Sequence, residues 1–258
     1  MEASAPCEAI VLRCTNYGEA DRIVTLLTRE LGICSAFARN ARNSRRRFGG
    51  ALHPFSRIRV LWQPRRRNGL AQLAEVELLN GAHGLMADLD ALAVAAYGCE
   101  LVTELWPEGQ AIPELFDLVQ AFLDALQGPA DIATVRLLME LRLLDDAGVL
   151  PHIGHCAECW AGLSTEKLRF DARRGGTLCP VCCGGEQGGV IVDAQTLGSL
   201  VRLLQVDPLV FAGIRLSSLT LEQGRRLLQH AVEVTLGRPL KSERFLEQIQ
   251  GPTPGVLP

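Results

Sequence analysis

Apolar and polar residues alternate along the first 80 residues with the period of two that is typical of half-buried β-strands. Within the segment 56–62, for example, Ile58, Val60 and Trp62 alternate mostly with arginines. The pattern predicts strands at 8–15, 20–28, 32–39, 56–62 and 70–79. Five short strands within about 75 residues indicate a small closed barrel or a sandwich, and a five-stranded barrel of the OB type fits the count.

From residue 84 onward the apolar positions take the spacing of α-helices. Leu85, Leu89, Leu92 and Ala96 lie on one helical face. Further helical stretches are predicted at 115–126, 137–144, 194–205 and 220–236, with a last short helix after Pro239. Residues 151–189 interrupt this pattern with cysteines and glycines, so they read as an insertion in a helical bundle.

The insertion contains two CxxC pairs in a chain with nine cysteines. The paired residues are Cys156, Cys159, Cys179 and Cys182. Two thiolates separated by two residues can curl around one cation, and two such pairs complete a tetrahedral shell. Four thiolates leave no coordination position open for water, so the spacing predicts one structural Zn²⁺ rather than a catalytic one.

Other ligand sets fit the same stretch. Cys183 directly follows Cys182 and is an alternative ligand, and His152 or His155 is an alternative to one of the cysteines. A redox-active CxxC pair is a third interpretation, but no thioredoxin-like βαβ pattern surrounds these cysteines.

These patterns predict an α+β multidomain protein. Its expected parts are an N-terminal five-stranded OB-type β-barrel at 1–80, an α-helical bundle domain at 81–150 and 190–250, an inserted CxxC…CxxC zinc-binding module at 151–189, and a flexible tail at 251–258.

The composition excludes disordered and membrane-spanning proteins. Hydrophobic residues make up 48% of the 258 residues and charged residues 21%, as in globular proteins. No apolar run reaches the roughly 18 residues that a membrane helix needs. The opening stretch MEASAPCEAIVLR has no basic segment followed by an apolar core, so it does not resemble a signal peptide. We therefore expect a soluble cytoplasmic protein without a membrane partner.

Charge is distributed unevenly along the chain, whose formal net charge is -3. Residues 1–80 hold 13 arginines and 7 acidic residues, a net charge of +6. Residues 81–150 hold 2 arginines and 12 acidic residues, a net charge of -10, and the remainder carries +1. The basic N-terminal part indicates an anionic partner that the acidic overall balance conceals.

The positive charge is concentrated between Leu31 and Ala74, where there is no Asp or Glu. The ten arginines of this stretch are Arg39, Arg42, Arg45, Arg46, Arg47, Arg57, Arg59, Arg65, Arg66 and Arg67. Unmixed positive charge repels itself unless an anion is its partner, and the planar guanidinium suits phosphate. The dense clusters fall between predicted strands, where the loops of a small barrel flank the face that binds single strands.

Nucleic acid is therefore the favoured partner, with membrane phospholipid and an acidic protein as alternatives. Phe48 lies nearby and is a candidate for stacking against bases, whereas Phe55 and Trp62 are expected in the core.

The chain contains none of the common catalytic motifs, such as GxxxxGK[ST], HExxH, GxSxG or GxGxxG at a strand–helix turn. We therefore expect a non-catalytic protein. Two other hypotheses stay open: a zinc-ribbon interaction protein that binds RNA or acts in transcription, and a zinc hydrolase that uses His152 or His155 at an open metal site.

Several segments, in order along the chain, resemble the RecO family of bacterial DNA repair and recombination mediators. AIVLRCTNYGEADRIVTLLTRELG is similar to the opening strand pair, ARNARNSRRRFGGALHPF to the basic loop, YGCELVTELWPEGQAIPELFDLV to the first helical hairpin, and LGRPLKSERFLEQ to the C-terminal signature. The chain departs from the family pattern at Asn40, where glycine is usual, and at Glu243, which precedes Arg244.

The resemblance implies an OB-fold, a helical domain and a zinc module, in a cytoplasmic protein associated with the bacterial nucleoid. It implies binding of single- and double-stranded DNA, annealing of complementary strands, and action with RecR and the single-stranded DNA-binding protein (SSB) in loading RecA. In the family, the acidic tail of SSB docks on the helical domain. Arg136, one of the two cations in 81–150, is with Leu137 and Leu138 a candidate contact for that tail.

Overall fold

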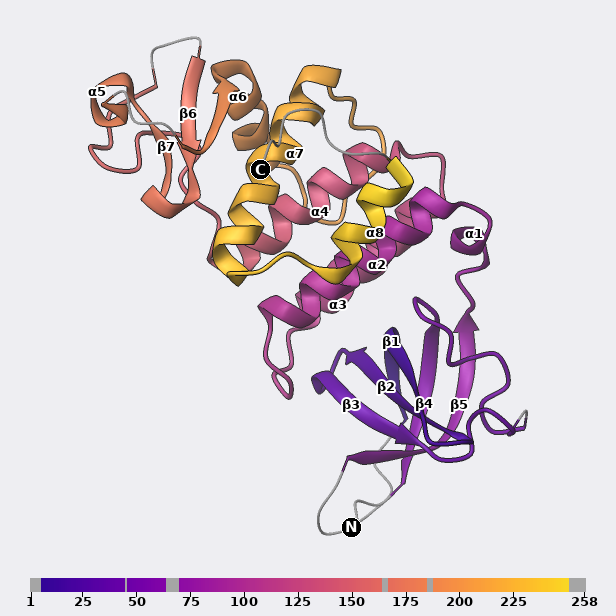
Figure 1. Ribbon diagram of the computed structural model, residues 1–258. Coiled ribbons are helices and arrows are strands. Elements are labelled where there is room, and N and C mark those ends of the chain that lie inside the picture. Colours follow the sequence, from indigo (N-terminus) through magenta and orange to yellow (C-terminus); the bar gives the residue numbers. More distant parts are fainter. Residues whose placement is uncertain (1–5, 45, 64–69, 164–166, 185–187, 251–258) are drawn as a thin grey trace. The chain divides into compact units, whose positions relative to one another are not determined.

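The computed structural model describes residues 6–44, 46–63, 70–163, 167–184 and 188–250 (Figure 1). The chain forms two compact units, Met1–Gln127 and Gly128–Pro258. This division falls inside the segment 81–150, so the helices of that segment are shared between the units. That all these helices form one domain stays a prediction.

The first unit contains the predicted β-barrel. Its strands are β1 (Cys7–Tyr17), β2 (Asp21–Thr28), β3 (Gly32–Ala38), β4 (Arg57–Gln63) and β5 (Ala71–Asn80). The barrel is closed in the order β1-β2-β3-β5-β4, because β1 pairs with both β2 and β4. All pairs are antiparallel except β3 with β5, which is parallel. The five predicted strands and the OB-type barrel are confirmed.

Alternating side chains of the strands fill the barrel, as the sequence pattern predicts. Ile58, Val60 and Trp62 are buried in one cluster with Val24 and Leu73. The indole Nε1 of Trp62 donates a hydrogen bond to the sulfur of Cys7 over 3.1 Å, which gives the buried N–H a partner.

The segment between β3 and β4 is irregular but firmly attached. Ala41, Phe48, Ala51 and Leu52 are buried in the barrel core. The segment therefore cannot lift away without exposing these apolar side chains, and the arginines between its anchors are held near the barrel.

Three helices complete the first unit (Figure 1). They are α1 (His83–Met86), α2 (Leu89–Leu105) and α3 (Pro113–Leu126). Asp88 caps α2 by accepting hydrogen bonds from the N–H groups of Asp90 and Ala91. An ion pair between Arg29, just after β2, and Asp117 of α3 ties the barrel to the helices.

Gly32 fixes the start of β3 against the segment that precedes α3. Its φ is +68°, and a Cβ built there would lie 1.8 Å from the carbonyl oxygen of Gln110. We expect Gly32→Ala to lower the free energy of unfolding by about 3 kcal/mol, through both backbone strain and overpacking. Urea denaturation measures this.

Gly18 is the matched control. It also has positive φ, +57°, but a Cβ there has no neighbour within 4 Å. Gly18→Ala should therefore cost only the strain, about 1 kcal/mol. Equal losses in the two variants would contradict the packing role of Gly32.

The second unit combines helices with a small sheet. Its elements are α4 (Ile132–Asp146), β6 (Lys167–Asp171), the 3-10 helix η1 (Ala172–Arg174), β7 (Gly176–Leu178), α5 (Pro180–Cys183), β8 (Val190–Asp193), α6 (Ala194–Leu203), α7 (Ser218–Leu236) and α8 (Lys241–Gln250). Helix α7 packs closely on α4, since a Cβ at Gly224 would lie 2.7 Å from Leu137 Cδ1.

The three-stranded sheet, in the order β7-β6-β8, was not predicted from the sequence. Its strand β8 follows the expected end of the insertion at 189 and connects directly to α6. Phe170 of β6 is buried, and its ring meets that of His230 on α7 with centroids 6.2 Å apart. The cysteine-rich module is therefore continuous with the helices of its unit.

Within the described ranges, the helices are too short or too polar to cross a membrane.

Candidate metal centre and nucleic-acid interface

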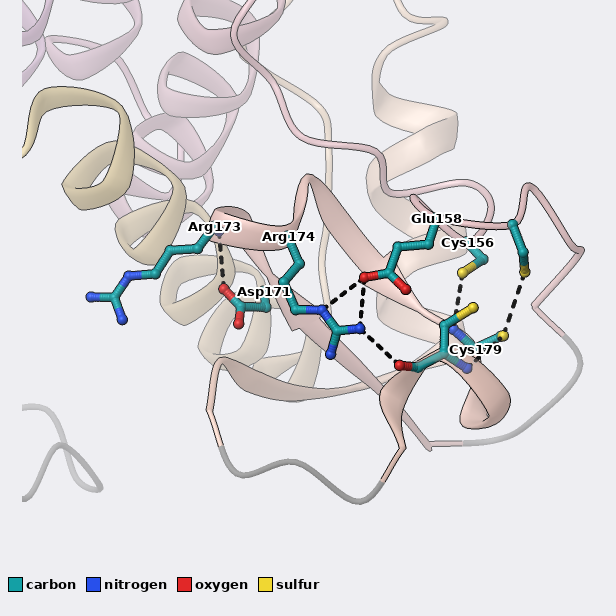
Figure 2. A network of polar contacts seen from close by, with 8 residues as sticks. Cys156, Glu158, Asp171, Arg173, Arg174 and Cys179 are labelled. Carbon is teal, nitrogen blue, oxygen red and sulfur yellow. Dashed lines mark hydrogen bonds and ion pairs between the residues drawn. The ribbon is translucent and has the colours of Figure 1, made fainter.

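The four predicted cysteines converge in the second unit, and Figure 2 shows Cys156 and Cys179 among them. Cys156 and Cys159 lie in the loop before β6, Cys179 follows β7, and Cys182 lies in α5. Their sulfur atoms all lie within 4.8 Å of one another, and those of Cys159 and Cys179 are 3.7 Å apart. A tetrahedral shell with metal–sulfur bonds of roughly 2.3 Å has edges of about 3.8 Å. The arrangement therefore fits one metal ion held by four thiolates.

Backbone N–H groups turn toward the sulfurs and favour their charged form. Cys179 N–H donates to Cys156 Sγ over 3.4 Å, and Cys182 N–H donates to Cys179 Sγ over 3.5 Å. Burial raises the pKa of Cys156, but hydrogen bonds from the backbone of Cys159, Cys179 and Glu158 outweigh it, and the pKa falls to about 6. The Cys156 thiol is thus poised to ionise and bind a cation near neutral pH.

The pKa of Cys182 shifts the opposite way. Hydrogen bonds with the sulfurs of Cys159 and Cys179 raise it well above its ordinary value. Thiolates this close repel one another, so the cluster cannot ionise fully without a compensating cation.

The structure answers the question of alternative ligands. Among the described residues, the metal-binding group consists of the four CxxC cysteines and includes neither Cys183 nor a histidine. The rings of His152 and His155 lie against Trp160 instead. Four cysteines close the coordination shell, so the geometry does not favour the zinc-hydrolase hypothesis.

Arg174 links the two cysteine loops from outside (Figure 2). Its guanidinium pairs with Glu158 over 2.6 Å and donates to the carbonyl oxygen of Cys182 over 2.8 Å. Glu158 of the first cysteine loop and Cys182 of the second are therefore both bonded to Arg174, which stabilises the position of one loop relative to the other. Sequence reasoning did not single out Arg174.

In the first unit, the structure groups four of the predicted arginines on the loop 39–47, which we call the basic loop. Arg39, Arg42 and Arg46 are exposed and Arg47 is half-buried. The Arg42 guanidinium donates to the Glu19 carbonyl over 2.8 Å, and that of Arg47 donates to the Arg39 carbonyl over 2.7 Å. These bonds fix the loop, whereas the Arg39 and Arg46 side chains make no contact recorded among the described residues.

Asn40 adopts the left-handed conformation, with φ of +57°, at the start of the basic loop. Its N–H donates to the Asp21 carboxylate over 2.7 Å. Asparagine tolerates this conformation better than most residues, so the turn survives without the glycine that is usual there.

Arg57 and Arg59 lie on β4, outside the basic loop. Arg59 pairs with Glu77 on the neighbouring strand over 2.7 Å and with Glu8 over 3.9 Å. Its charge is therefore largely compensated, and Arg57 is half-buried. Arg45, Arg65, Arg66 and Arg67 lie outside the described residues. Nucleic-acid contacts by these six arginines, like those by the four of the basic loop, stay predictions.

The prediction that Phe48 stacks against bases is wrong, because Phe48 is buried in the barrel core and only 2% exposed. An unpredicted aromatic pair lies on the outer surface instead. Tyr17 is 56% exposed, and its ring meets that of Phe37 edge-on with centroids 5.8 Å apart. Thr15 of β1 and Phe37 of β3 both pair with Ile23 of β2, so their side chains lie on the same face of the sheet. Tyr17 lies two residues after Thr15 and therefore shares that face with Phe37. The sequence contained one signal for this aromatic pair: Phe37 lies two positions before Arg39 in a predicted strand, where residues two apart share a face.

The residues expected to contact a partner tail are buried. Arg136 is 6% exposed, and its Nε donates to Glu140 over 2.8 Å within α4. Leu137 and Leu138 are buried as well. Every residue of α4 from Thr134 to Leu144 is buried, so this part of the helix lacks the solvent-facing side that the tail contact requires. The tail contact stays a prediction that this geometry does not favour.

Burial of the Arg136–Glu140 ion pair leads to a testable prediction about the stability of the protein. Arg136→Met leaves the Glu140 carboxylate buried without its partner, and we expect the free energy of unfolding to fall by about 3–5 kcal/mol. The double variant Arg136→Met, Glu140→Leu should recover most of this loss, because neither member of the pair is then left as a buried charge. Urea denaturation measures both. Wild-type stability of Arg136→Met, together with weaker binding of an SSB tail peptide, would instead support the tail contact.

Two family models match the chain, and their boundary at residues 82–86 differs from the division of the structure at residues 127–128. Residues 1–82 match the family described as Recombination protein O N terminal, and residues 86–244 match Recombination protein O C terminal. The chain is 43% identical to DNA repair protein RecO of Syntrophotalea carbinolica, over 94% of this chain and 93% of that protein. It is 42% identical to DNA repair protein RecO of Anaeromyxobacter dehalogenans strain 2CP-1, over 98% and 99%. Identity to DNA repair protein RecO of Myxococcus xanthus is 38%, over 94% and 96%. The chain therefore belongs to the RecO family of DNA repair proteins.

Proposed function

We propose that this protein is a mediator of recombinational DNA repair that binds single- and double-stranded DNA and anneals complementary strands. With RecR, it helps RecA load onto single strands coated by SSB. The observation that carries the proposal is the basic loop with its exposed arginines, together with the Tyr17–Phe37 aromatic pair on the surface of an OB-type barrel, in a chain of the RecO family.

The two features of this surface suit the two parts of a DNA strand. The guanidinium groups of Arg39 and Arg46 are exposed and suit phosphates, with affinity supplied by release of counterions. Tyr17 and Phe37 offer ring surface to unpaired bases, whose stacking is tolerant of sequence. A surface that holds a strand without reading its sequence is what annealing needs.

We infer that the ion in the four-cysteine cluster is Zn²⁺ and that its role is structural. A closed shell of four thiolates is typical of structural zinc, which stabilises the loops that bind it. The proposed activity breaks no covalent bond, so we infer a non-catalytic protein that works in the bacterial cytoplasm at the nucleoid.

An annealing assay tests the proposed function. Two complementary oligonucleotides carrying a fluorescence donor and acceptor are coated with SSB, and the full-length protein is added. We expect annealing to be accelerated, and RecA filament formation on SSB-coated DNA to be accelerated when RecR is also present. Tight DNA binding with no acceleration of either reaction would overturn the mediator role.

A further inference from the structure

Trp160 lies at the rim of the cysteine cluster in a backbone conformation that bulky residues avoid. Its φ is +62°, and its side chain is 65% exposed. Its N–H donates to the Cys156 carbonyl over 3.0 Å, and the Cys156 N–H donates to the Ala161 carbonyl over 3.0 Å. The cysteine loop therefore enforces the conformation. Glycine would fit this position without strain, so folding alone does not account for a tryptophan there.

The indole ring is also pre-positioned by its neighbours. The ring of His155 stacks on it with centroids 4.2 Å apart and an angle of 25° between planes. The ring of His152 meets it at 60°, with centroids 5.0 Å apart. Because the indole stays largely exposed despite these contacts, the rings form a rigid aromatic platform open to a further planar group. We call Trp160, His152 and His155 the aromatic platform.

The surroundings of the platform favour a nucleobase as that planar group. Two of the groups that flank the indole are imidazole rings, which carry hydrogen-bonding nitrogens. Gly175 accepts a hydrogen bond from His152 N–H over 2.9 Å, so the turn that carries Arg173 and Arg174 runs beside the platform. The Arg173 side chain is exposed and extends away from the cysteine cluster (Figure 2), where it suits a phosphate further along a strand.

We propose that the aromatic platform is a second contact for single-stranded DNA, in which Trp160 stacks on an unpaired base. This inference rests on the proposed function, since it assigns a further part of the DNA-binding surface. It adds to the protein a DNA contact in the second unit, separate in sequence from the basic loop.

Trp160→Gly and Trp160→Phe test the inference. Glycine removes the ring but suits the backbone, so metal content and melting temperature should stay close to those of the wild type. Phenylalanine keeps a stacking ring at the same backbone cost. We expect Trp160→Gly to bind a fluorescein-labelled 30-nucleotide oligo(dT) about 5- to 100-fold more weakly, and Trp160→Phe to bind within about 3-fold of the wild type.

Intrinsic fluorescence gives a direct readout. The chain has three tryptophans, of which Trp62 is buried and Trp106 is half-buried. We expect oligo(dT) to quench the wild-type emission, and the quenched component to disappear in Trp160→Phe although the DNA is still bound. Titrations follow both signals in the full-length protein.

The outcomes separate this inference from the proposed function. If the wild type does not bind oligo(dT), the proposed function fails and the inference fails with it. If the wild type binds and Trp160→Gly binds equally well, only the inference fails. If Trp160→Gly loses its metal, the fluorescence comparison tests the inference instead. Equal quenching of the wild type and of Trp160→Phe by oligo(dT) would then overturn it.

Discussion

Cys182→Ser is expected to abolish stoichiometric metal binding and to unfold the cysteine-rich part of the second unit. Cys182 supplies one of four sulfurs that all lie within 4.8 Å of one another. Structural zinc contributes apparent binding free energies of about 10–16 kcal/mol in small zinc-binding peptides, and this free energy is also folding free energy. Losing one of four thiolates should therefore cost on the order of 5 kcal/mol or more. Metal analysis of the purified protein and thermal denaturation, with and without EDTA, measure the two effects.

Cys183→Ser is the matched control, since it makes the same chemical change at the adjacent position. Cys183 lies outside the four-cysteine group, and its N–H is bonded to the Cys179 carbonyl over 2.9 Å whichever side chain it carries. We expect Cys183→Ser to keep one metal ion and a melting temperature near that of the wild type. The assignment of ligands would be wrong if the two variants lost metal to the same extent.

The barrel was predictable because its strands satisfy a local rule. Residues such as Ile58 and Val60 alternate with polar ones, and one side of each strand fills the core. In the sheet of the second unit, β6 follows the same rule, with Leu168 and Phe170 buried between polar residues. Strand β7 has only three residues, all of them buried, which is too few to show a period of two. The pairing of β7 with β6 therefore depends on contacts that the sequence pattern does not express.

The four-cysteine cluster was predictable for a related reason. CxxC spacing is itself the local geometry that binds a metal, so Cys156 and Cys182 could be assigned from the sequence. Partners that are distant in sequence could not be assigned. Glu77 neutralises Arg59 from the neighbouring strand, and the burial of Arg136 depends on how α4 packs. The backbone conformation of Trp160 is likewise visible only in three dimensions.

A second large effect is expected when the arginines of the basic loop are replaced. We expect replacement of Arg39, Arg42, Arg46 and Arg47 by alanine to flatten the dependence of single-stranded DNA affinity on salt. Each phosphate contact contributes about 0.7 to the slope of log K against log salt, so four contacts contribute about 3. At 0.1 M salt the affinity should fall by about 100- to 1000-fold. Fluorescence anisotropy with labelled oligo(dT) over a range of salt concentrations measures both quantities.

Subsets of these arginines separate binding from loop structure. Arg39 and Arg46 are exposed and make no recorded side-chain bonds within the described part of the chain, so their double alanine variant should lower the slope by about 1.4 and leave the melting temperature unchanged. Arg42 and Arg47 hold the loop through the carbonyl oxygens of Glu19 and Arg39, so their double alanine variant should lower the melting temperature as well.

Two further sets of variants serve as controls. One keeps the positive charge of the basic loop, and the other removes an arginine whose charge is already compensated. Replacing Arg39 and Arg46 by lysine should retain the wild-type slope, because counterion release depends on charge and not on the shape of the guanidinium. Arg59→Ala should change the slope by less than about 0.7, since Glu77 and Glu8 already compensate Arg59. If the fourfold alanine variant kept the wild-type slope, the basic loop would not contact DNA. The unmixed positive charge of this stretch would then require a different anionic partner.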